Sequence, residues 1–267
     1  MSSYVHGYKL QENKRLRDQA DALVELLHRD TSYSAGSKVL EVGCGVGAQT
    51  LILARRSPEA KFTCLDVSHE SMTKAKQNVE AAGLTNVNCE YADLFALPYE
   101  PETFDHVFVC FLLEHLSRAR EALPILKGVL RRRGTITVIE GDHGSTFFHP
   151  DNHSANAAID SLIKMQRQMG GNALIGRELY PLLVEAGFDN VRVSPRMVYV
   201  DGSQPALADS FTRKTFTAMV EGVRDRVIAA GLIEPERFNA GIKALYRTSE
   251  RDGVFCYTFF KAVACKL

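Results

Sequence analysis

The sequence predicts an α/β fold built on a doubly wound, mostly parallel sheet. Two observations lead to this prediction. Short β-branched or aromatic runs alternate with helical stretches from residue 38 onward, and a glycine-rich turn follows the first run. The runs are short and rich in β-branched or aromatic residues, as in strands that helices cover on both faces, and parallel neighbours need right-handed crossovers. With 267 residues, 45% of them hydrophobic, the chain can form one large domain with an added cap.

The elements follow in order along the chain. Leucines and alanines at helical spacing in "NKRLRDQADALVELLHRD" predict an amphipathic helix that packs beside the main domain. The next expected elements are the strand "KVLEV", a helix near 48–56, the strand "KFTCLDV", a helix near 70–82, the strands "VNCEY" and "FDHVFVCF", a helix in "RAREALPILKGVLRRR" and the strand "TITVIE". The arginines at 131–133 before Gly134 are interpreted as the cationic, glycine-capped end of that helix.

The second half of the chain is less regular. The segment "EGDHGSTFFHPDNH" is expected to be a loop that leaves the carboxyl edge of the sheet. Helices are expected near 155–169 and 177–186, followed by a strand in "NVRVSPRMVYV", a mostly helical block near 205–248 and a final strand in "GVFCYTFFKAVACKL".

Composition favours a small-molecule ligand. The 32 Lys and Arg balance the 32 Asp and Glu, so no global positive field attracts nucleic acid or anionic membranes. Neither a leader nor an apolar run of membrane-spanning length is evident, and the cytoplasm is the expected location. The six cysteines are scattered without a CxxC pair, so neither disulfides nor a zinc site are expected.

The stretch "VLEVGCGVGAQTLIL" carries the strongest local signal. Glycines between a buried strand and a helix permit positive φ angles and let a ligand approach the backbone. Gly43, Gly45 and Ala48 satisfy a dinucleotide-binding fingerprint, with Asp66 about twenty residues on, so an NAD site is one reading. Glu41 beside the turn would repel a pyrophosphate, so a ligand with positive charge fits better.

The segments "VLEVGCGVG", "LDVS", "YADLFALPYEPETFDHVFVCFLLEHL" and "GREL" with "LLVEAGF" resemble class I S-adenosylmethionine-dependent methyltransferases, especially small-molecule enzymes of the ubiquinone and menaquinone type. The similarity is strongest over residues 38–142. It implies a Rossmann-like, seven-stranded sheet with an antiparallel last strand and a helical cap. Residues 1–35 would form an N-terminal lid and helix, and residues 36–267 the methyltransferase domain with cap insertions near 145–170 and 203–250.

The resemblance also implies a cofactor site and a reaction. S-Adenosylmethionine would donate a methyl group to an O, N or C atom of a small, partly apolar acceptor. Asp66 would bind the ribose hydroxyls and Asp93 the adenine amino group. The other implied cofactor contacts are Glu41, Gly43, Cys44, Gly45, Val67, Met72, Ala92, Leu94, Cys110 and Phe111. A non-catalytic S-adenosylmethionine-binding regulator and an NAD-dependent oxidoreductase remain the alternatives.

The catalytic residues are harder to predict, because a sulfonium methyl group needs mainly an aligned nucleophile and the exclusion of water. His143 is the candidate general base, since histidine titrates near neutrality and its loop is expected over the site. It can equally be a surface-loop histidine. Tyr8 is expected to contact the site from the N-terminal lid, unless that segment is a frayed terminus.

Further polar and aromatic residues have more than one reading. Asp142, His143, His149, Asp151 and His153 fit no compact ligand motif, and no metal is expected. His115 is interpreted as a helix-start or core histidine rather than a catalytic one. Aromatic and methionine side chains in the expected cap can line an apolar pocket or form its core; they are Phe147, Phe148, Met165, Met169, Tyr199, Phe211, Phe216 and Met219.

Overall fold

The computed structural model describes residues 23–267. Residues 23–28 form the described part of the expected N-terminal helix, and Tyr8 lies outside the described residues. Leu23 and Leu27 of this helix are buried against the sheet. An ion-pair group fixes the end of the helix, because Asp30 accepts from Lys261 and Arg196 on two strands of the sheet.

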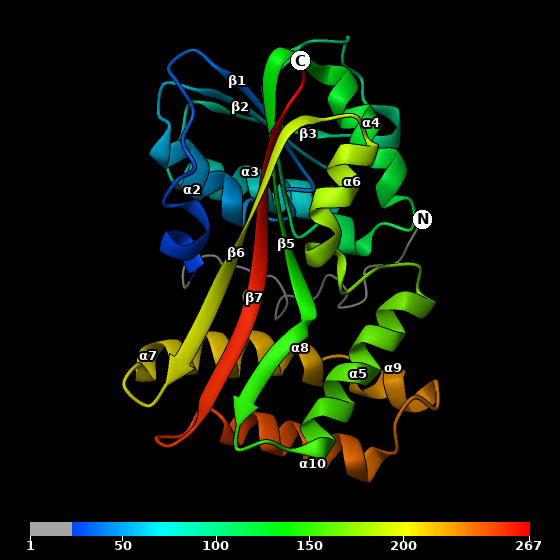
Figure 1. Ribbon diagram of the computed structural model, residues 1–267. Coiled ribbons are helices and arrows are strands. Elements are labelled where there is room, and N and C mark those ends of the chain that lie inside the picture. Colours follow the sequence, from blue (N-terminus) through cyan, green and yellow to red (C-terminus); the bar gives the residue numbers. More distant parts are fainter. Residues whose placement is uncertain (1–22) are drawn as a thin grey trace.

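One seven-stranded sheet organises the chain, in the order β3-β2-β1-β4-β5-β7-β6. The strands are β1 (Lys38–Val42), β2 (Lys61–Asp66), β3 (Val87–Tyr91), β4 (Phe104–Cys110), β5 (Leu130–His149), β6 (Asp189–Asp201) and β7 (Val254–Cys265). The first five pair in parallel, whereas β7 runs antiparallel to both β5 and β6 (Figure 1). This confirms the predicted doubly wound, mostly parallel sheet with an antiparallel last strand.

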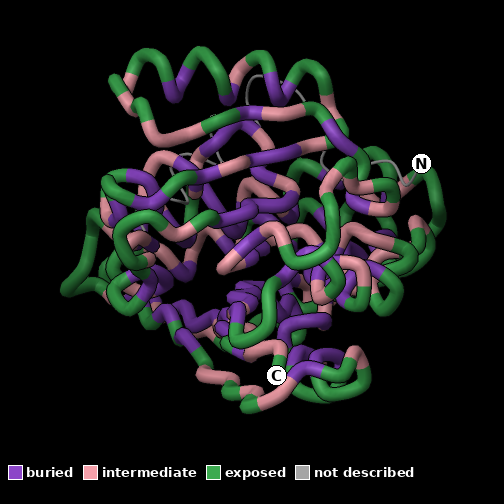
Figure 2. Tube along the Cα trace, turned by 90° about the horizontal axis from the view of Figure 1, so that it is seen from above, coloured by how far each residue is buried: buried purple, intermediate pink, exposed green. Residues whose placement is uncertain are grey.

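Helices cover both faces of the sheet, because successive side chains of each strand point to opposite sides. Val39, Phe62 and Phe108 belong to the core cluster that includes side chains of α2 (Ala48–Arg56). Leu40 and Val107 belong to the cluster on the other face, with side chains of α4 (Ala119–Val129) and α6 (Leu179–Glu185). The buried strands run through the middle of the molecule in Figure 2. The helix α3 (His69–Ala81) packs with β2 and β3 through a third, smaller cluster.

Strands β5, β6 and β7 extend beyond the other four strands of the sheet, and a second group of helices packs on their extensions (Figure 1). We call this group the helical lobe; it comprises α5 (His153–Gln168), α7 (Pro205–Leu207), the π-helix η4 (Ala208–Thr217), α8 (Ala218–Glu221), α9 (Arg224–Ala229) and α10 (Pro235–Arg247). Phe211 and Phe216 of η4 pack against Phe255 at the start of β7. Because the lobe is built on strands of the main sheet, its packing fixes side chains near the strand ends.

Two sequence predictions about β5 were wrong. The helix α4 ends at Val129, and the arginines at 131–133 lie in β5, where Leu130 already pairs with Phe104. The segment after Glu140, expected as a loop, continues β5 to His149 because β7 supplies its partner. The pairing is interrupted only by a register shift between Asp142 and Phe147. Both differences arise from pairing with residues distant in the sequence, which outweighs local turn signals.

Candidate active site

The glycine turn joins β1 to α2 and has positive φ angles at Gly43, Gly45 and Gly47. A Cβ on Gly43 would lie 2.7 Å from Cδ1 of Leu112, so glycine allows the turn to pack against the segment after β4. A Cβ on Gly45 would meet no heavy atom within 4 Å. The backbone at Gly45 therefore leaves room for a ligand, whereas that at Gly43 fits the protein itself.

Asp66 is the last residue of β2, and its carboxylate hydrogen-bonds to the backbone of the glycine turn. Its Oδ2 accepts a hydrogen bond from the Gly45 N–H at 3.0 Å, and its Oδ1 accepts from the Ser68 N–H at 2.8 Å. Partial burial raises the pKa of Asp66, and these backbone donors offset the effect in part. A carboxylate has about four acceptor positions, so Asp66 can also accept from the two hydroxyls of a ribose.

Glu41 lies in β1 and is only 2% exposed. Its Oε2 has no hydrogen-bond partner within residues 23–267. Burial raises the pKa of Glu41 to about 7, and the nearby Thr50 hydroxyl offsets this shift only in part. An open glycine backbone, a carboxylate with unused acceptor positions and a buried acceptor that lacks a donor among the described residues together fit a cationic, phosphate-free adenosine derivative such as S-adenosylmethionine.

The other predicted cofactor residues divide between the protein core and the edge of the sheet. Cys44 and Met72 are buried together beneath the turn, with their sulfur atoms 3.7 Å apart. Ala92 and Leu94 are also buried, and they join the core cluster on the opposite face. The structure therefore brings Cys44 and Met72 to the turn but packs Leu94 largely into protein.

Val67 and Asp93 lie exposed at the carboxyl edge. Asp93 caps the 3₁₀ helix η1 (Leu94–Ala96), because its Oδ1 accepts from the Phe95 N–H at 2.9 Å. Its second oxygen can still accept from a ligand. Cys110 ends β4 and is buried, and Phe111 adopts a positive φ of 55° and packs against a ring of β7.

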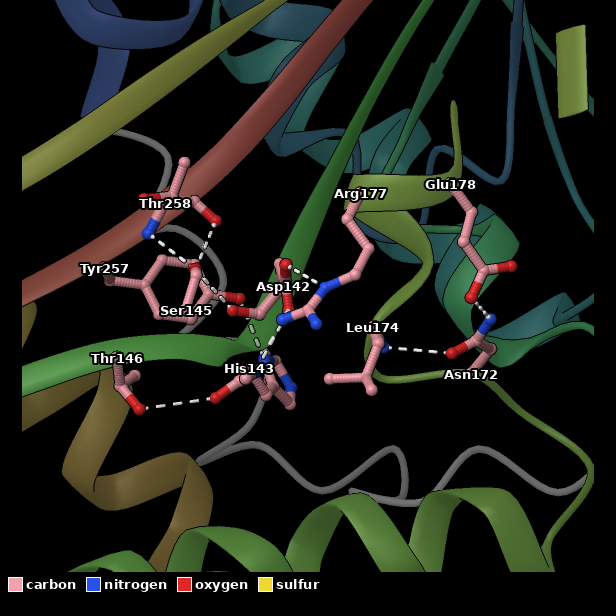
Figure 3. A network of polar contacts seen from close by, with 11 residues as sticks. Asp142, His143, Ser145, Thr146, Asn172, Leu174, Arg177, Glu178, Tyr257 and Thr258 are labelled. Atoms are coloured by element: carbon pink, nitrogen blue, oxygen red, sulfur yellow. Dashed lines mark hydrogen bonds and ion pairs between the residues drawn. The ribbon is translucent and has the colours of Figure 1, made fainter. Parts of the chain in front are cut away.

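His143 is a buried residue of β5 rather than a surface-loop residue. It is 4% exposed, and its Nδ1 lies 2.8 Å from the Tyr257 hydroxyl on β7. Its Nε2 lies 3.8 Å from Oε2 of Glu114, in the 3₁₀ helix η2 (Leu113–His115) after β4. Figure 3 shows His143 at the centre of this polar network, beside the pair formed by Asp142 and Arg177. The ring thus contacts two polar groups, one on β7 and one after β4.

Asp142 and Arg177 hold the neighbouring part of β5. Both carboxylate oxygens of Asp142 accept from the guanidinium of Arg177, at 2.7 and 2.8 Å, and Oδ1 also accepts from the Gly144 N–H. Arg177 comes from the 3₁₀ helix η3 (Ile175–Glu178), which leads into α6. Since bidentate pairs of this kind have a defined geometry, the pair stabilises the backbone on which His143 lies.

Four polar residues of this region, Glu114, Glu140, Gln166 and Tyr257, were missed by the sequence analysis. Glu140 is 0% exposed; its Oε1 accepts from the Leu112 and Leu113 N–H groups, while Oε2 has no partner in the described chain. Burial, and then the charge of Glu114, raise the pKa of Glu140 well above its usual range. A carboxylate at the end of a buried strand was the signal that singled out Glu41, and it applies equally to Glu140.

The remaining candidates do not assemble into a metal site. Among residues 23–267, no three His, Cys, Asp or Glu side chains are close enough together to hold a metal ion. His115 contacts Oε1 of Glu114 through its Nε2, at 3.4 Å. The aromatic side chains of the helical lobe differ in their surroundings, since Phe211 and Phe216 are buried in the core whereas Phe147 is exposed.

Comparisons with known proteins find methyltransferases. A family described as "Methyltransferase domain" matches residues 39–134. The methyltransferase GfsG of Streptomyces halstedii is 27% identical over 210 residues, which cover 78% of this chain and 73% of the relative. The malonyl-[acyl-carrier protein] O-methyltransferase of a Paenibacillus species is 27% identical over 197 residues, 71% of this chain and 69% of the relative.

A solved structure shows the same fold. Phosphoethanolamine N-methyltransferase 2 of Haemonchus contortus aligns with a TM-score of 0.58 at 16% identity, over 93% of this chain and 52% of that one. The matched domain and these relatives support an S-adenosylmethionine-dependent methyltransferase with a small-molecule acceptor, and neither the regulatory nor the NAD-dependent alternative is favoured.

Gly141 lies against the hydroxyl group of Tyr257, and a larger residue there provides a stability test of this packing. A Cβ at Gly141 would lie 2.2 Å from the Tyr257 hydroxyl oxygen but 3.3 Å from the ring carbon that carries it. Gly141→Ala should therefore destabilise the fold by about 1–3 kcal/mol through overpacking. Adding Tyr257→Phe should restore most of this loss, because it removes the clashing oxygen. Urea unfolding of both variants tests this, and a double variant no more stable than the single one would contradict it.

Proposed function

We propose that methyl transfer takes place where β1, β4 and β5 end beneath the helical lobe, with His143 as the general base. The observation that supports this most directly is the position of His143, buried at the carboxyl edge with its Nδ1 on the Tyr257 hydroxyl. The tautomer suited to a base carries its proton on Nδ1 and donates it to Tyr257. Nε2 can then take a proton from the acceptor, and the Glu114 carboxylate stabilises the resulting imidazolium.

The other residues of the proposed site bind and orient the cofactor and the acceptor. Gly45 and Asp66 hold the nucleoside and methionine parts of the cofactor, and Glu41 faces its positive charge. When bound, S-adenosylmethionine supplies an electrophilic methyl group on a sulfonium ion. The segments around α5 and residues 205–247 cap the site and exclude water from it. Alignment of the acceptor then contributes most of the rate enhancement.

We also propose a cytoplasmic enzyme without a nucleic-acid or membrane partner. The equal numbers of acidic and basic residues support this, because they provide no broad positive surface. All six cysteines are free, including Cys64 and Cys89, whose sulfur atoms lie 3.2 Å apart across neighbouring strands. Free thiols at that distance suit a reducing compartment.

No helix in the described part of the chain is long and apolar enough to cross a membrane.

The proposed cofactor site can be tested with Asp66→Ala. We expect this variant to bind S-adenosylhomocysteine less tightly by about 1–3 kcal/mol, since it loses charge-assisted hydrogen bonds to the ribose as well as support for the turn. Isothermal titration calorimetry measures the affinity, and Asp160→Ala, at an exposed position of α5, is the matched control. An unchanged affinity in the Asp66 variant would remove this carboxylate from the site.

A further inference from the structure

A group of buried oxygen atoms beside His143 has too few hydrogen-bond donors. We call it the carboxylate–amide cluster and define it as the side-chain oxygens of Glu114, Glu140 and Gln166. Oε2 of Glu140 and Oε1 of Gln166 have no partner within residues 23–267, although the two residues are 0% and 2% exposed. Buried acceptors without a donor are rare in folded proteins, so each needs an explanation.

The orientation of the Gln166 amide follows from its contacts. Its Nε2 donates to the Glu114 backbone oxygen at 3.0 Å and lies 3.4 Å from Glu114 Oε2. The reverse orientation would place amide oxygen against two oxygens, so Oε1 is the atom left without a donor. Gln166 belongs to α5 of the helical lobe, whereas Glu114 follows β4 and Glu140 lies within β5 of the sheet. The cluster therefore lies at the junction of the two parts.

Among the described residues, no lysine or arginine pairs with the cluster, and only the imidazoles of His115 and His143 lie within ion-pair distance of Glu114. Glu114 and Glu140 are close enough for the charge of Glu114 to raise the pKa of Glu140. Arg177 and Lys261 are paired with other carboxylates, those of Asp142 and Asp30. Two buried carboxylates without a cation are costly unless a ligand supplies the positive charge. Glu41 already faces the charge of the cofactor, so the carboxylate–amide cluster can serve a second cationic group.

We infer that the carboxylate–amide cluster binds the amino group of the methyl acceptor, so that this enzyme is an N-methyltransferase of amines. The inference rests on the proposed placement of methyl transfer at His143. An ammonium group has three N–H donors, so it can donate to two of these oxygens and keep one N–H for Nε2 of His143, whereas a hydroxyl has a single donor. The apolar part of the amine would face the aromatic side chains of the helical lobe, Phe211 and Phe216 among them.

Protons, bonds and charge are all accounted for in the proposed methylation at these residues. The bound ammonium gives one proton to Nε2 of His143, which frees the nitrogen lone pair. That lone pair forms a bond to the methyl carbon while the carbon–sulfur bond breaks and leaves its electron pair on sulfur. The product is a methylammonium ion, which keeps the positive charge that the carboxylates bind. His143 later loses its proton to solvent.

The inference is tested by binding rather than by turnover alone. With S-adenosylhomocysteine saturating, calorimetry compares butylamine and phenethylamine with the alcohols of equal size, butanol and 2-phenylethanol. We expect the amines to bind at least about tenfold more tightly, and Glu114→Gln to weaken amine binding by roughly 10- to 100-fold, as for a lost hydrogen bond to a charged group. The alcohols should be unaffected by the substitution, and a +14 mass product should form from an amine when S-adenosylmethionine is supplied.

Controls separate this inference from the proposed function. Glu185→Gln makes the same change at an exposed ion pair and should leave amine binding unchanged. Should Glu114→Gln fail to fold, Gln166→Met removes a different oxygen of the cluster and should give the same loss. Equal binding of amines and alcohols, or no amine binding at all, would overturn the inference. Failure of S-adenosylhomocysteine itself to bind would instead count against the proposed cofactor site.

Discussion

Replacing His143 by Gln should lower kcat by about 10²- to 10⁴-fold, the usual contribution of a general base, and leave the affinity for S-adenosylhomocysteine unchanged. Glutamine has a similar length and can still hydrogen-bond to Tyr257, but it cannot take up a proton. His143 contacts Tyr257 and Glu114 rather than the glycine turn, so the cofactor end of the site should be unaffected. The rate is measured as S-adenosylhomocysteine release, with an acceptor selected from a pooled library of amines and alcohols.

A second histidine provides the control for this substitution. His106 lies near the start of β4, at the opposite edge of the sheet, and its Nδ1 lies 2.8 Å from the Thr135 hydroxyl. His106→Gln should keep kcat within about twofold of the wild-type value, because it changes no group near the carboxyl edge. Loss of activity in both variants would indicate a general packing effect. Full activity in His143→Gln would mean that alignment alone drives the reaction.

The residues of the proposed cofactor half could be singled out from the sequence because they lie close together along two neighbouring strands. The turn with Gly43 and Gly45 follows directly from β1, and Asp66 ends the strand beside it, so short-range patterns suffice to place them together. Glu41 was recognisable as a carboxylate inside a buried strand. The alternation of strands and helices likewise needed only periodicity, and it identified the sheet and its order of elements.

The acceptor half could not be read in the same way, because it is assembled over long distances. His143 and Tyr257 are 114 residues apart, and they meet only because β5 pairs antiparallel with β7. That same pairing turns an expected loop, with its two glycines, into strand. Gln166 reaches Glu114 from the helical lobe across 52 residues. No local pattern carries such contacts, although Glu140 shares the signal that identified Glu41.

Glu41→Gln should stabilise the ligand-free protein by about 3 kcal/mol at pH 8, because folding raises the pKa of the Glu41 carboxyl group and the substitution removes this ionisation. Burial moves the pKa of Glu41 from its ordinary 4.5 to about 7. A carboxyl group whose pKa is raised by folding binds its proton more tightly in the folded state. Its contribution to stability is therefore complete below pH 4.5 and is lost as the pH rises through 7. Glutamine resembles the protonated carboxyl group and avoids this loss.

Urea unfolding from pH 4.5 to 8.5 tests the free protein, with Glu80→Gln at an exposed position of α3 as the matched control. The stability difference between Glu41→Gln and wild type should grow with pH and vanish near pH 4.5, because other titrating groups cancel in the comparison. A difference that does not vary with pH would contradict the raised pKa.

In the complex the same substitution should have the opposite effect, since in the proposed site the ionised Glu41 faces the positive charge of the cofactor. The wild-type affinity for S-adenosylmethionine should rise as Glu41 loses its proton, and it should level off above pH 7. The affinity of Glu41→Gln should be lower at pH 8 and nearly independent of pH across that range. Titration calorimetry at pH 6 and pH 8 distinguishes the two, because a purely structural Glu41 would leave both affinities with the same pH dependence. A carboxylate that costs stability when the site is empty and contributes affinity when it is filled is typical of a residue kept for binding.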